Sequence, residues 1–181
     1  MRKLIIAVFL FTSSMMSNSN ADGHGIKMGI ILGFTGPIES LTPAMADSAE
    51  IAFKEASASG SLLNGETITV VKVDTTCRDS SVASAVAKEI ISQGVKAILG
   101  GVCSEVTETI LSEAAVPNGI VMISPAATSA SLTSLDDKGF FFRTTPSEAR
   151  GGQILADITK DRRVKKVAIT YTNNDLSLIH I

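Results

Sequence analysis

Three short stretches of this sequence place small, hydroxyl-bearing or glycine residues directly after apolar runs. They are GFTGPIESLTP from Gly33, GGVCSEVT from Gly100 and SPAATSAS from Ser124. In an open sheet of parallel strands, ligands gather at the carboxyl ends of the strands, beside the N-termini of the following helices. The free backbone N–H groups at such helix ends favour an anionic group such as a carboxylate. The three stretches therefore predict a pocket for a small acid.

Ser104 has the most defined role in these stretches. It follows Gly100 and Gly101, which let the backbone approach another group closely, and it opens a helical pattern. Its hydroxyl could cap that helix, with Thr107 at the position where a capping box would carry glutamate. It could equally donate to a ligand carboxylate. The residues alone leave both interpretations open.

Catalytic chemistry finds little support. GVCSE does not match the nucleophile elbow G-x-S-x-G, and Gly29, Gly33 and Gly36 do not fit the dinucleotide-binding spacing G-x-G-x-x-G. Asp74 lies about forty residues beyond those glycines, whereas that motif places its ribose-binding acid about twenty residues on. The sequence has no P-loop and no His/Cys metal cluster, and we interpret Asp74 and Asp79 as caps rather than calcium ligands. We expect no enzyme, no cofactor and no metal.

The N-terminal residues have the order of a secretory signal. Basic Arg2 and Lys3 precede an apolar run over residues 4–11, and small polar residues follow as far as Ala21. We expect cleavage near Ala21, which leaves an exported chain from residue 22 onward. Loss of two basic residues and no acid changes the formal net charge from −2 to −4. A mildly acidic chain of mixed charge gives no reason to propose nucleic acid or an anionic membrane surface as partner.

The last six residues, LSLIHI (176–181), have an unusual origin. They back-translate to CTGTCTCTTATACACATC, which resembles the transposon mosaic end used to prepare sequencing libraries. We interpret them as adapter sequence, the alternative being a genuine apolar C-terminus. His24 is then the remaining histidine of the exported chain, which removes most histidine-dependent mechanisms.

Cys77 and Cys103 are the two cysteines of the chain. In an oxidising compartment an even number of cysteines favours a disulfide. Two free thiols that pack as small hydrophobic residues are the alternative.

Short apolar runs alternate with longer amphipathic segments from Lys27 onward. Strands are predicted over residues 27–34, 67–74, 96–101, 119–123, 140–143 and 166–171. Helices are predicted over residues 43–59 and 80–93, from Ser104 to a stop at Pro117, and over 148–160, the last buried through Ile154, Leu155 and Ile158. This alternation, with strands apolar on both faces, predicts an α/β fold with a parallel sheet flanked by helices.

The stretch TTPSEARGGQ (144–153) interrupts this rhythm. Residues 22–145 have a plausible length for one core, whereas residues 146–175 are too few to build another. We therefore predict one complete domain over 22–145 and the start of a second over 146–175.

Three longer stretches resemble a known family: VDTTCRDSSVASAVAKEIISQGVKAILGGVCSEVT, IVMISPAATSASLT and FFFRTTPSEARGGQ. They are similar to the N-terminal lobe of the periplasmic leucine/isoleucine/valine-binding proteins, the type I solute-binding proteins of ABC transporters. The likeness covers roughly residues 26–175. Its most specific parts are the cysteine pair, S-P-A-A-T and F-R-T. The resemblance implies a type I periplasmic-binding-protein lobe, with the start of a second lobe in residues 146–175.

The resemblance also implies a function. The protein would be periplasmic, would capture a branched-chain or similar apolar amino acid between two lobes, and would deliver it to a membrane ABC permease. The alternative with the same fold is a ligand-sensing domain of a receptor, or an amide or amino-acid regulator. Neither role needs covalent chemistry or a cofactor.

The family's functional residues correspond to positions of this sequence. The cysteine pair is a disulfide in the family, which implies a bond between Cys77 and Cys103. By resemblance, the Ser104 hydroxyl and the N–H and hydroxyl of Thr128 hold the ligand's carboxylate. The Ala126 carbonyl accepts from the ligand's ammonium group, and Ala127 lies between Ala126 and Thr128 in the site.

The sequence departs from the family pattern at two positions. The family places an aromatic residue in the first loop, where this sequence has Leu41, which would form an apolar wall of different shape. Leu176 stands where the family has the tyrosine that closes over the ligand. The acidic partner of the ligand's ammonium group would also lie beyond Asp175, so the resemblance implies half of a binding site.

Overall fold

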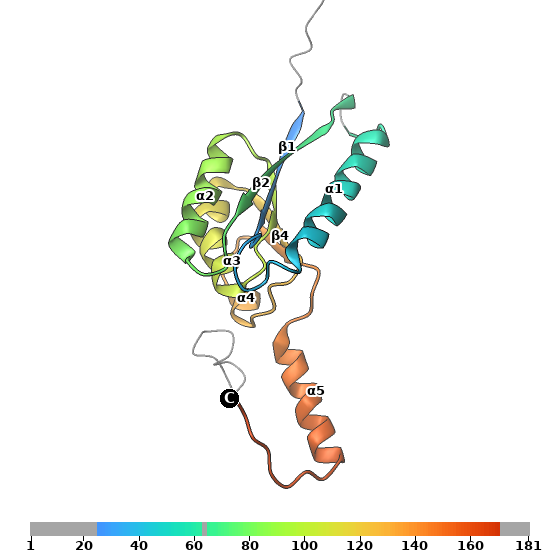
Figure 1. Ribbon diagram of the computed structural model, residues 1–181, viewed down its shortest axis with the longest axis vertical. Coiled ribbons are helices and arrows are strands. Elements are labelled where there is room, and N and C mark those ends of the chain that lie inside the picture. Colours follow the sequence, from blue (N-terminus) through green and yellow to red (C-terminus); the bar gives the residue numbers. More distant parts are fainter. Residues whose placement is uncertain (1–24, 63–64, 171–181) are drawn as a thin grey trace, which may run out of the picture.

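The computed structural model describes residues 25–62 and 65–170, and its centre is a parallel sheet (Figure 1). The five strands are β1 (Ile26–Leu32), β2 (Ile68–Asp74), β3 (Ala97–Gly100), β4 (Val121–Ser124) and β5 (Phe141–Arg143). They lie in the order β2-β1-β3-β4-β5, and every neighbouring pair is parallel. The first five predicted strands and the parallel α/β fold are thereby confirmed. The predicted signal and the predicted adapter sequence fall outside the described residues.

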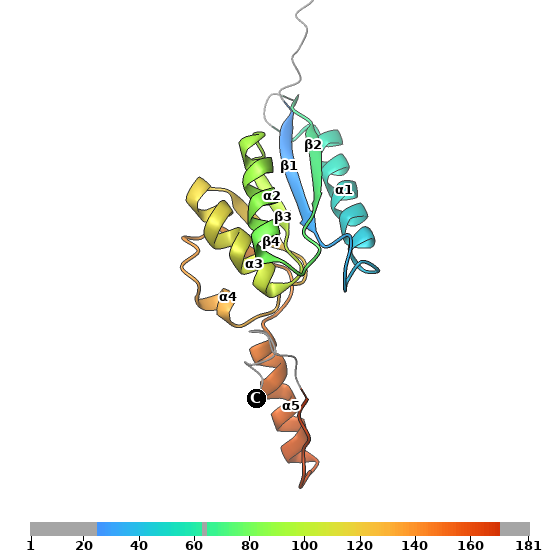
Figure 2. The ribbon, with the colours of Figure 1, turned by 60° about the vertical axis from the view of Figure 1, so that its left-hand side comes forward.

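Helices connect consecutive strands and cover both faces of the sheet, and one further helix follows the last strand. They are α1 (Thr42–Ala58), α2 (Ser80–Ser92), α3 (Ser104–Ile110), the short α4 (Ser131–Ser134) and α5 (Glu148–Asp161). Figure 2 shows α1 on one face and α2 and α3 on the other. The chain continues from α3 through a π-helical segment, Leu111–Ala115, and a 3₁₀ turn, Val116–Asn118. None of the helices in residues 25–62 and 65–170 has the length and apolar content that a bilayer crossing requires.

The interior strand β1 contributes side chains to the core on both faces of the sheet. Ile30 and Leu32 pack with α1, whereas Ile31 points to the opposite face and packs with α2 and α3. All three side chains are fully buried, and such side chains each contribute about 1.5 to 3 kcal/mol through removal of apolar surface from water. This burial on both faces explains why the strand reads as an uninterrupted apolar run.

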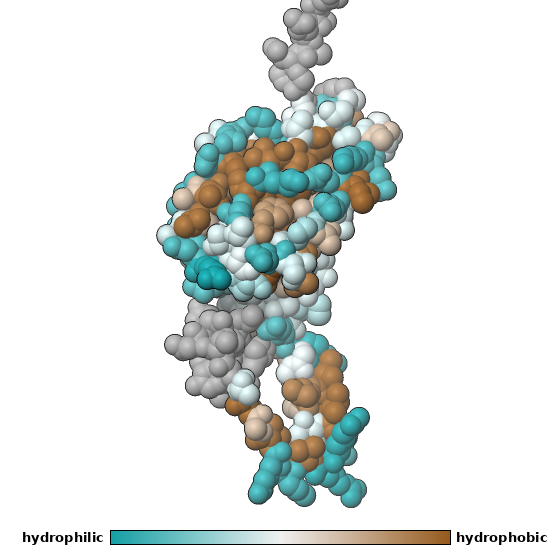
Figure 3. All heavy atoms as spheres, viewed as in Figure 1, coloured by the Kyte–Doolittle hydropathy of each residue, from teal (hydrophilic) through white to brown (hydrophobic). Residues whose placement is uncertain are grey.

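Two predictions for the C-terminal part are wrong. Helix α5 forms as expected, but Ile154, Leu155 and Ile158 are 45%, 65% and 44% exposed rather than buried. Residues 166–170 form no strand and are exposed. Figure 1 shows α5 standing apart from the sheet, and Figure 3 shows hydrophobic surface along it. An apolar stripe needs a surface to pack on, and a strand needs a neighbour to hydrogen-bond. Neither is present among the described residues.

Candidate functional site

A pocket of about 340 Å³ lies at the carboxyl ends of the strands. The chain runs from β1 to β2 on one side and then returns to β3 on the other side of β1. This reversal of strand order is the position where open parallel sheets leave a crevice for ligands. The walls come from the loops after four strands: Pro37 and Ile38 follow β1, Cys77, Arg78 and Ser80 follow β2, Val102, Cys103, Ser104, Glu105 and Val106 follow β3, and Ala126 and Thr128 follow β4.

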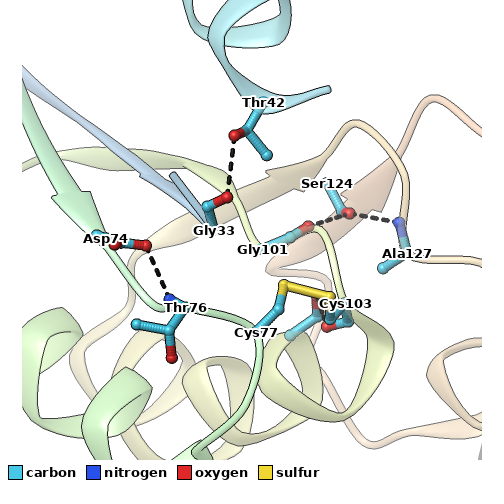
Figure 4. The surroundings of a disulfide bond; sticks show 10 residues. Gly33, Thr42, Asp74, Thr76, Cys77, Gly101, Cys103, Ser124 and Ala127 are labelled. Atoms are coloured by element: carbon cyan, nitrogen blue, oxygen red, sulfur yellow. Dashed lines mark hydrogen bonds between the residues drawn. A yellow bond between two sulfur atoms is a disulfide. The ribbon is translucent and has the colours of Figure 1, made fainter. Parts of the chain in front are cut away.

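A disulfide forms part of this wall. It joins Cys77 to Cys103, with their Cα atoms 5.7 Å apart, which confirms the predicted pairing. Because β1 lies between β2 and β3, the bond crosses the end of β1 (Figure 4). The backbone of Thr76 and Cys77 is left-handed, with φ of 56° and 53°. A Cβ atom at Gly33 would lie 3.0 Å from Cys77 Sγ, so the loop after β1 passes close beneath the bond.

Asp74 and Asp79 organise the loop that carries Cys77. Asp74 accepts from the Thr35 hydroxyl and, at 2.8 Å, from the Thr76 N–H. Partial burial raises the pKa of Asp74, but these hydrogen bonds outweigh it, and the pKa is lowered overall. Asp79 accepts from the Ser81 N–H at 2.8 Å and caps α2, as predicted. Among residues 25–62 and 65–170, no group of three or more potential metal ligands gathers.

Ser104 does not cap α3, so that interpretation is wrong. The Cys103 carbonyl accepts from the Thr107 N–H at 2.9 Å and from its hydroxyl at 2.8 Å, which makes Cys103 the boundary residue. Ser104 therefore lies inside the first turn, and its Oγ accepts from the Ser129 N–H at 3.2 Å. A serine hydroxyl has one proton to donate. Because Ser104 also lines the pocket, that proton can be directed to a ligand.

The glycines before Ser104 make room for the fold itself. A Cβ atom at Gly101 would lie 2.8 Å from Thr107 Oγ1, and one at Gly100 would collide with the backbone of Ile31. Gly100 also has a φ of 151°, which side-chain-bearing residues rarely adopt. The close approach predicted at this glycine pair is therefore an approach to the chain's own strand and helix.

Ser124 ties together the loops after β3 and β4, a role that sequence reasoning missed. Its fully buried hydroxyl donates to the Gly101 carbonyl at 2.6 Å and accepts from the Ala127 N–H at 2.9 Å and the Ala126 N–H at 3.3 Å. Figure 4 shows Ser124 between Gly101 and Ala127. A serine that bonds N–H groups two and three residues on is a known turn former, so its position before Pro125 was a usable signal.

Arg143 on β5 holds the other side of the β4 loop. Its guanidinium donates to the Ser129 carbonyl at 2.8 Å and the Ala127 carbonyl at 3.4 Å, and it also bonds the Thr133 hydroxyl. Sequence reasoning placed Arg143 at the end of a predicted strand and within F-R-T, and gave its side chain no role. The guanidinium fixes the backbone on both sides of Thr128, because several donors in one planar group restrain the geometry.

The predicted ligand residues fall into two groups. Ser104, Ala126 and Thr128 meet in the pocket. Within the described part of the chain, neither the N–H nor the hydroxyl of Thr128 has a hydrogen-bond partner, while its carbonyl accepts from the Glu148 N–H at 3.0 Å. Ala127 is fully buried behind the pocket wall. Leu41 is 56% exposed at the start of α1 and does not line the pocket, whereas Ile38 of the same loop does.

Comparisons with known proteins agree with this geometry. A Leu/Ile/Val-binding protein of Citrobacter freundii is 31% identical over 160 residues, and the match covers 86% of this chain and 42% of that protein. The chain thus spans less than half the length of that relative. An ABC transporter substrate-binding protein from Desulfitobacterium hafniense, solved in complex with Leu, is 27% identical, with a TM-score of 0.68 over 85% of this chain and 44% of its own.

A solute-binding protein of an ABC transporter from R. palustris, solved in complex with benzoate, is 25% identical. Its TM-score is 0.65, over 78% of this chain and 38% of its own. Residues 44–179 match the model of a family described as the receptor family ligand binding region. That match covers well over half of this sequence, and the chain therefore belongs to the receptor family ligand binding region family.

Proposed function

We propose that this chain is the first lobe of an exported solute-binding protein, which captures a branched-chain or similar apolar amino acid for a membrane ABC permease. The observation that carries the proposal is the pocket where Ser104, Ala126 and Thr128 meet. The Citrobacter freundii relative is named for binding Leu, Ile and Val, and the Desulfitobacterium hafniense neighbour was solved with Leu. Both are binding proteins rather than enzymes.

The groups around the pocket match the polar end of an amino acid. The hydroxyls of Ser104 and Thr128 and the Thr128 N–H are donors for a carboxylate, and charge-assisted hydrogen bonds of this kind are about twice as strong as neutral ones. The Ala126 carbonyl has no partner within the described residues and can accept from an ammonium group. Ile38 and Val102 supply apolar wall for the side chain.

The ammonium acceptor favours an amino acid over an aromatic acid. The R. palustris neighbour was solved with benzoate, which shares the carboxylate but has no ammonium group. A buried carbonyl that loses its water and gains no donor is costly, by about 1 to 3 kcal/mol. The Ala126 carbonyl would meet that situation with benzoate and not with leucine.

A second lobe would complete the site. In our proposal residues 22–145 form the first lobe, residues 146–175 begin the second, the signal before residue 22 is removed in the periplasm, and residues 176–181 are adapter. The exposed apolar stripe on α5 supports a further surface that covers it. A ligand that contacts both lobes shifts the population toward a closed form. If a membrane-spanning or signalling segment follows the second lobe, the same closure serves a sensor instead of a permease.

Calorimetric titration of the full-length mature protein tests the proposal. We expect saturable binding of leucine, isoleucine or valine and weak binding of benzoate. Ser104→Ala should weaken leucine binding by about 10- to 100-fold, because it removes one hydrogen bond to a charged group.

Ser112→Ala is the matched control, since that exposed hydroxyl bonds the Glu108 carbonyl and Ser112 does not line the pocket. Its leucine affinity should equal that of the parent protein. Tight benzoate binding with no heat from any amino acid would refute the proposed ligand class. Equal leucine affinity in Ser104→Ala would remove Ser104 from the site.

A further inference from the structure

Two charged side chains line the pocket, Arg78 with a positive charge and Glu105 with a negative one, and Arg78 has no partner within the described residues. It is exposed, and within the described residues it forms no hydrogen bond or ion pair. Two other cations of the same lobe have acidic partners: Lys72 contacts Glu50 at 2.7 Å, and Lys88 contacts Glu113 at 3.3 Å. The positive charge of Arg78 is therefore left for another partner.

The backbone holds Arg78 at a defined place. It follows Cys77, which is fixed by the disulfide and by a left-handed backbone. Gly36, with a φ of 98°, lies against this turn, and a Cβ atom there would be 3.4 Å from Arg78 Nε. The guanidinium thus lies beside the loop after β1, at the edge of the pocket.

Arg78 and the proposed carboxylate site belong to loops that follow different strands and line one pocket. Arg78 follows β2 and Ser104 follows β3, and these strands flank β1. The two loops converge beyond the strand ends, because the Cα atoms of Cys77 and Cys103, which directly precede Arg78 and Ser104, are 5.7 Å apart. The disulfide lies between them. Arg78, Ser104 and Thr128 line one pocket, so a ligand whose α-carboxylate meets Ser104 and Thr128 has the Arg78 guanidinium in the same cavity.

We propose that Arg78 is a second anion-binding point, which lets the pocket hold acidic amino acids through both carboxylates in addition to apolar ones. This inference rests on the proposed amino-acid pocket, but not on an apolar side chain in the ligand. A guanidinium matches a carboxylate with two parallel hydrogen bonds. With an apolar side chain, closure would remove water from the guanidinium without supplying a partner, which lowers the preference for that ligand.

Titration of full-length Arg78→Gln with glutamate and with leucine tests the inference. We expect the substitution to weaken glutamate binding by about tenfold or more, because a charge-assisted hydrogen bond is lost. Leucine affinity should change by less than about threefold, or improve, because the unpaired charge is removed. Arg78→Lys should retain part of the glutamate affinity, since it keeps the charge and loses the bidentate geometry.

Lys54→Gln is the control for net charge. Its side chain is 77% exposed on α1 and does not line the pocket, so neither affinity should change. Thermal midpoints of all variants check that the fold is intact. If leucine binds but glutamate does not, or if Arg78→Gln leaves the ratio of the two affinities unchanged, the inference is wrong and the amino-acid pocket stands. If neither amino acid binds, the proposed function fails and the inference fails with it.

Discussion

Replacement of Ser124 by alanine should destabilise the lobe strongly, although it removes a single oxygen atom. The hydroxyl is fully buried and joins two loops by a donor bond to the Gly101 carbonyl and acceptor bonds from two backbone N–H groups. Alanine fits the same space and forms none of these bonds. The expected cost therefore comes from the backbone groups that lose their partner, rather than from lost packing.

The structure gives the magnitude. The Gly101 carbonyl and the Ala127 N–H belong to buried residues, and no other partner within the described residues reaches them. A buried polar group that loses its partner costs about 1 to 3 kcal/mol, so the two together should cost about 2 to 6 kcal/mol. The longer bond from Ala126, at 3.3 Å on a half-buried residue, adds little.

Urea unfolding of the full-length protein measures this cost. Ser48→Ala is the matched control, because that exposed hydroxyl bonds only the Ala44 carbonyl within α1. It should change the free energy of unfolding by no more than about 0.5 kcal/mol. The m-value should stay constant, which attributes the change to stability rather than to compactness. A loss in Ser124→Ala no larger than that of Ser48→Ala would refute the reasoning, because the buried backbone groups would then have found other partners.

Two further predictions concern the loop that joins β2 to α2. Replacement of both Cys77 and Cys103 by serine should lower the free energy of unfolding by about 3.5 kcal/mol, since the bond closes a loop with a sequence separation of 26; equal urea midpoints with and without the bond would contradict this. Asp79→Ala should lower the urea midpoint at pH 7, because the Ser81 hydroxyl and nearby N–H groups lower the pKa of Asp79 in the folded chain. That stabilisation is present above the unfolded pKa of about 4 and is lost as the pH falls through the lower folded pKa. The difference in urea midpoint between Asp79→Ala and the parent protein should therefore narrow below about pH 4. A difference in midpoint that stays constant with pH would contradict this prediction.

Much of the fold could be predicted because hydrophobic periodicity reports it directly. Ile30, Ile31 and Leu32 are apolar in succession, and such a run is typical of a strand covered on both faces. The same reasoning failed at α5 and at residues 166–170. A pattern of apolar residues indicates which face seeks cover, but it does not indicate whether the covering surface lies within the chain.

The candidate site was less accessible to sequence reasoning. Ser104, Ala126 and Thr128 were assigned by resemblance, and the structure brings them to one pocket. Ser124 and Arg143 act on carbonyls 23 and 14 to 16 residues away, and neither periodicity nor local motifs report such distant contacts. In the loop after β1, Leu41 was expected in the pocket, but Ile38 lines it instead. No repeating pattern in a loop indicates which of its side chains points into a pocket.

The bond between Cys77 and Cys103 also determines what happens to the lobe after proteolytic cleavage of the backbone between them. It closes a covalent ring that contains the whole of α2 and β3. A single proteolytic cut within residues 78–102 would therefore leave one connected molecule, whose two pieces separate only after reduction. Arg78 and Ser104, on the two sides of the pocket, would stay tethered to each other in a nicked chain. Such a ring preserves the link between the two loops of the pocket after a cut in the backbone between them.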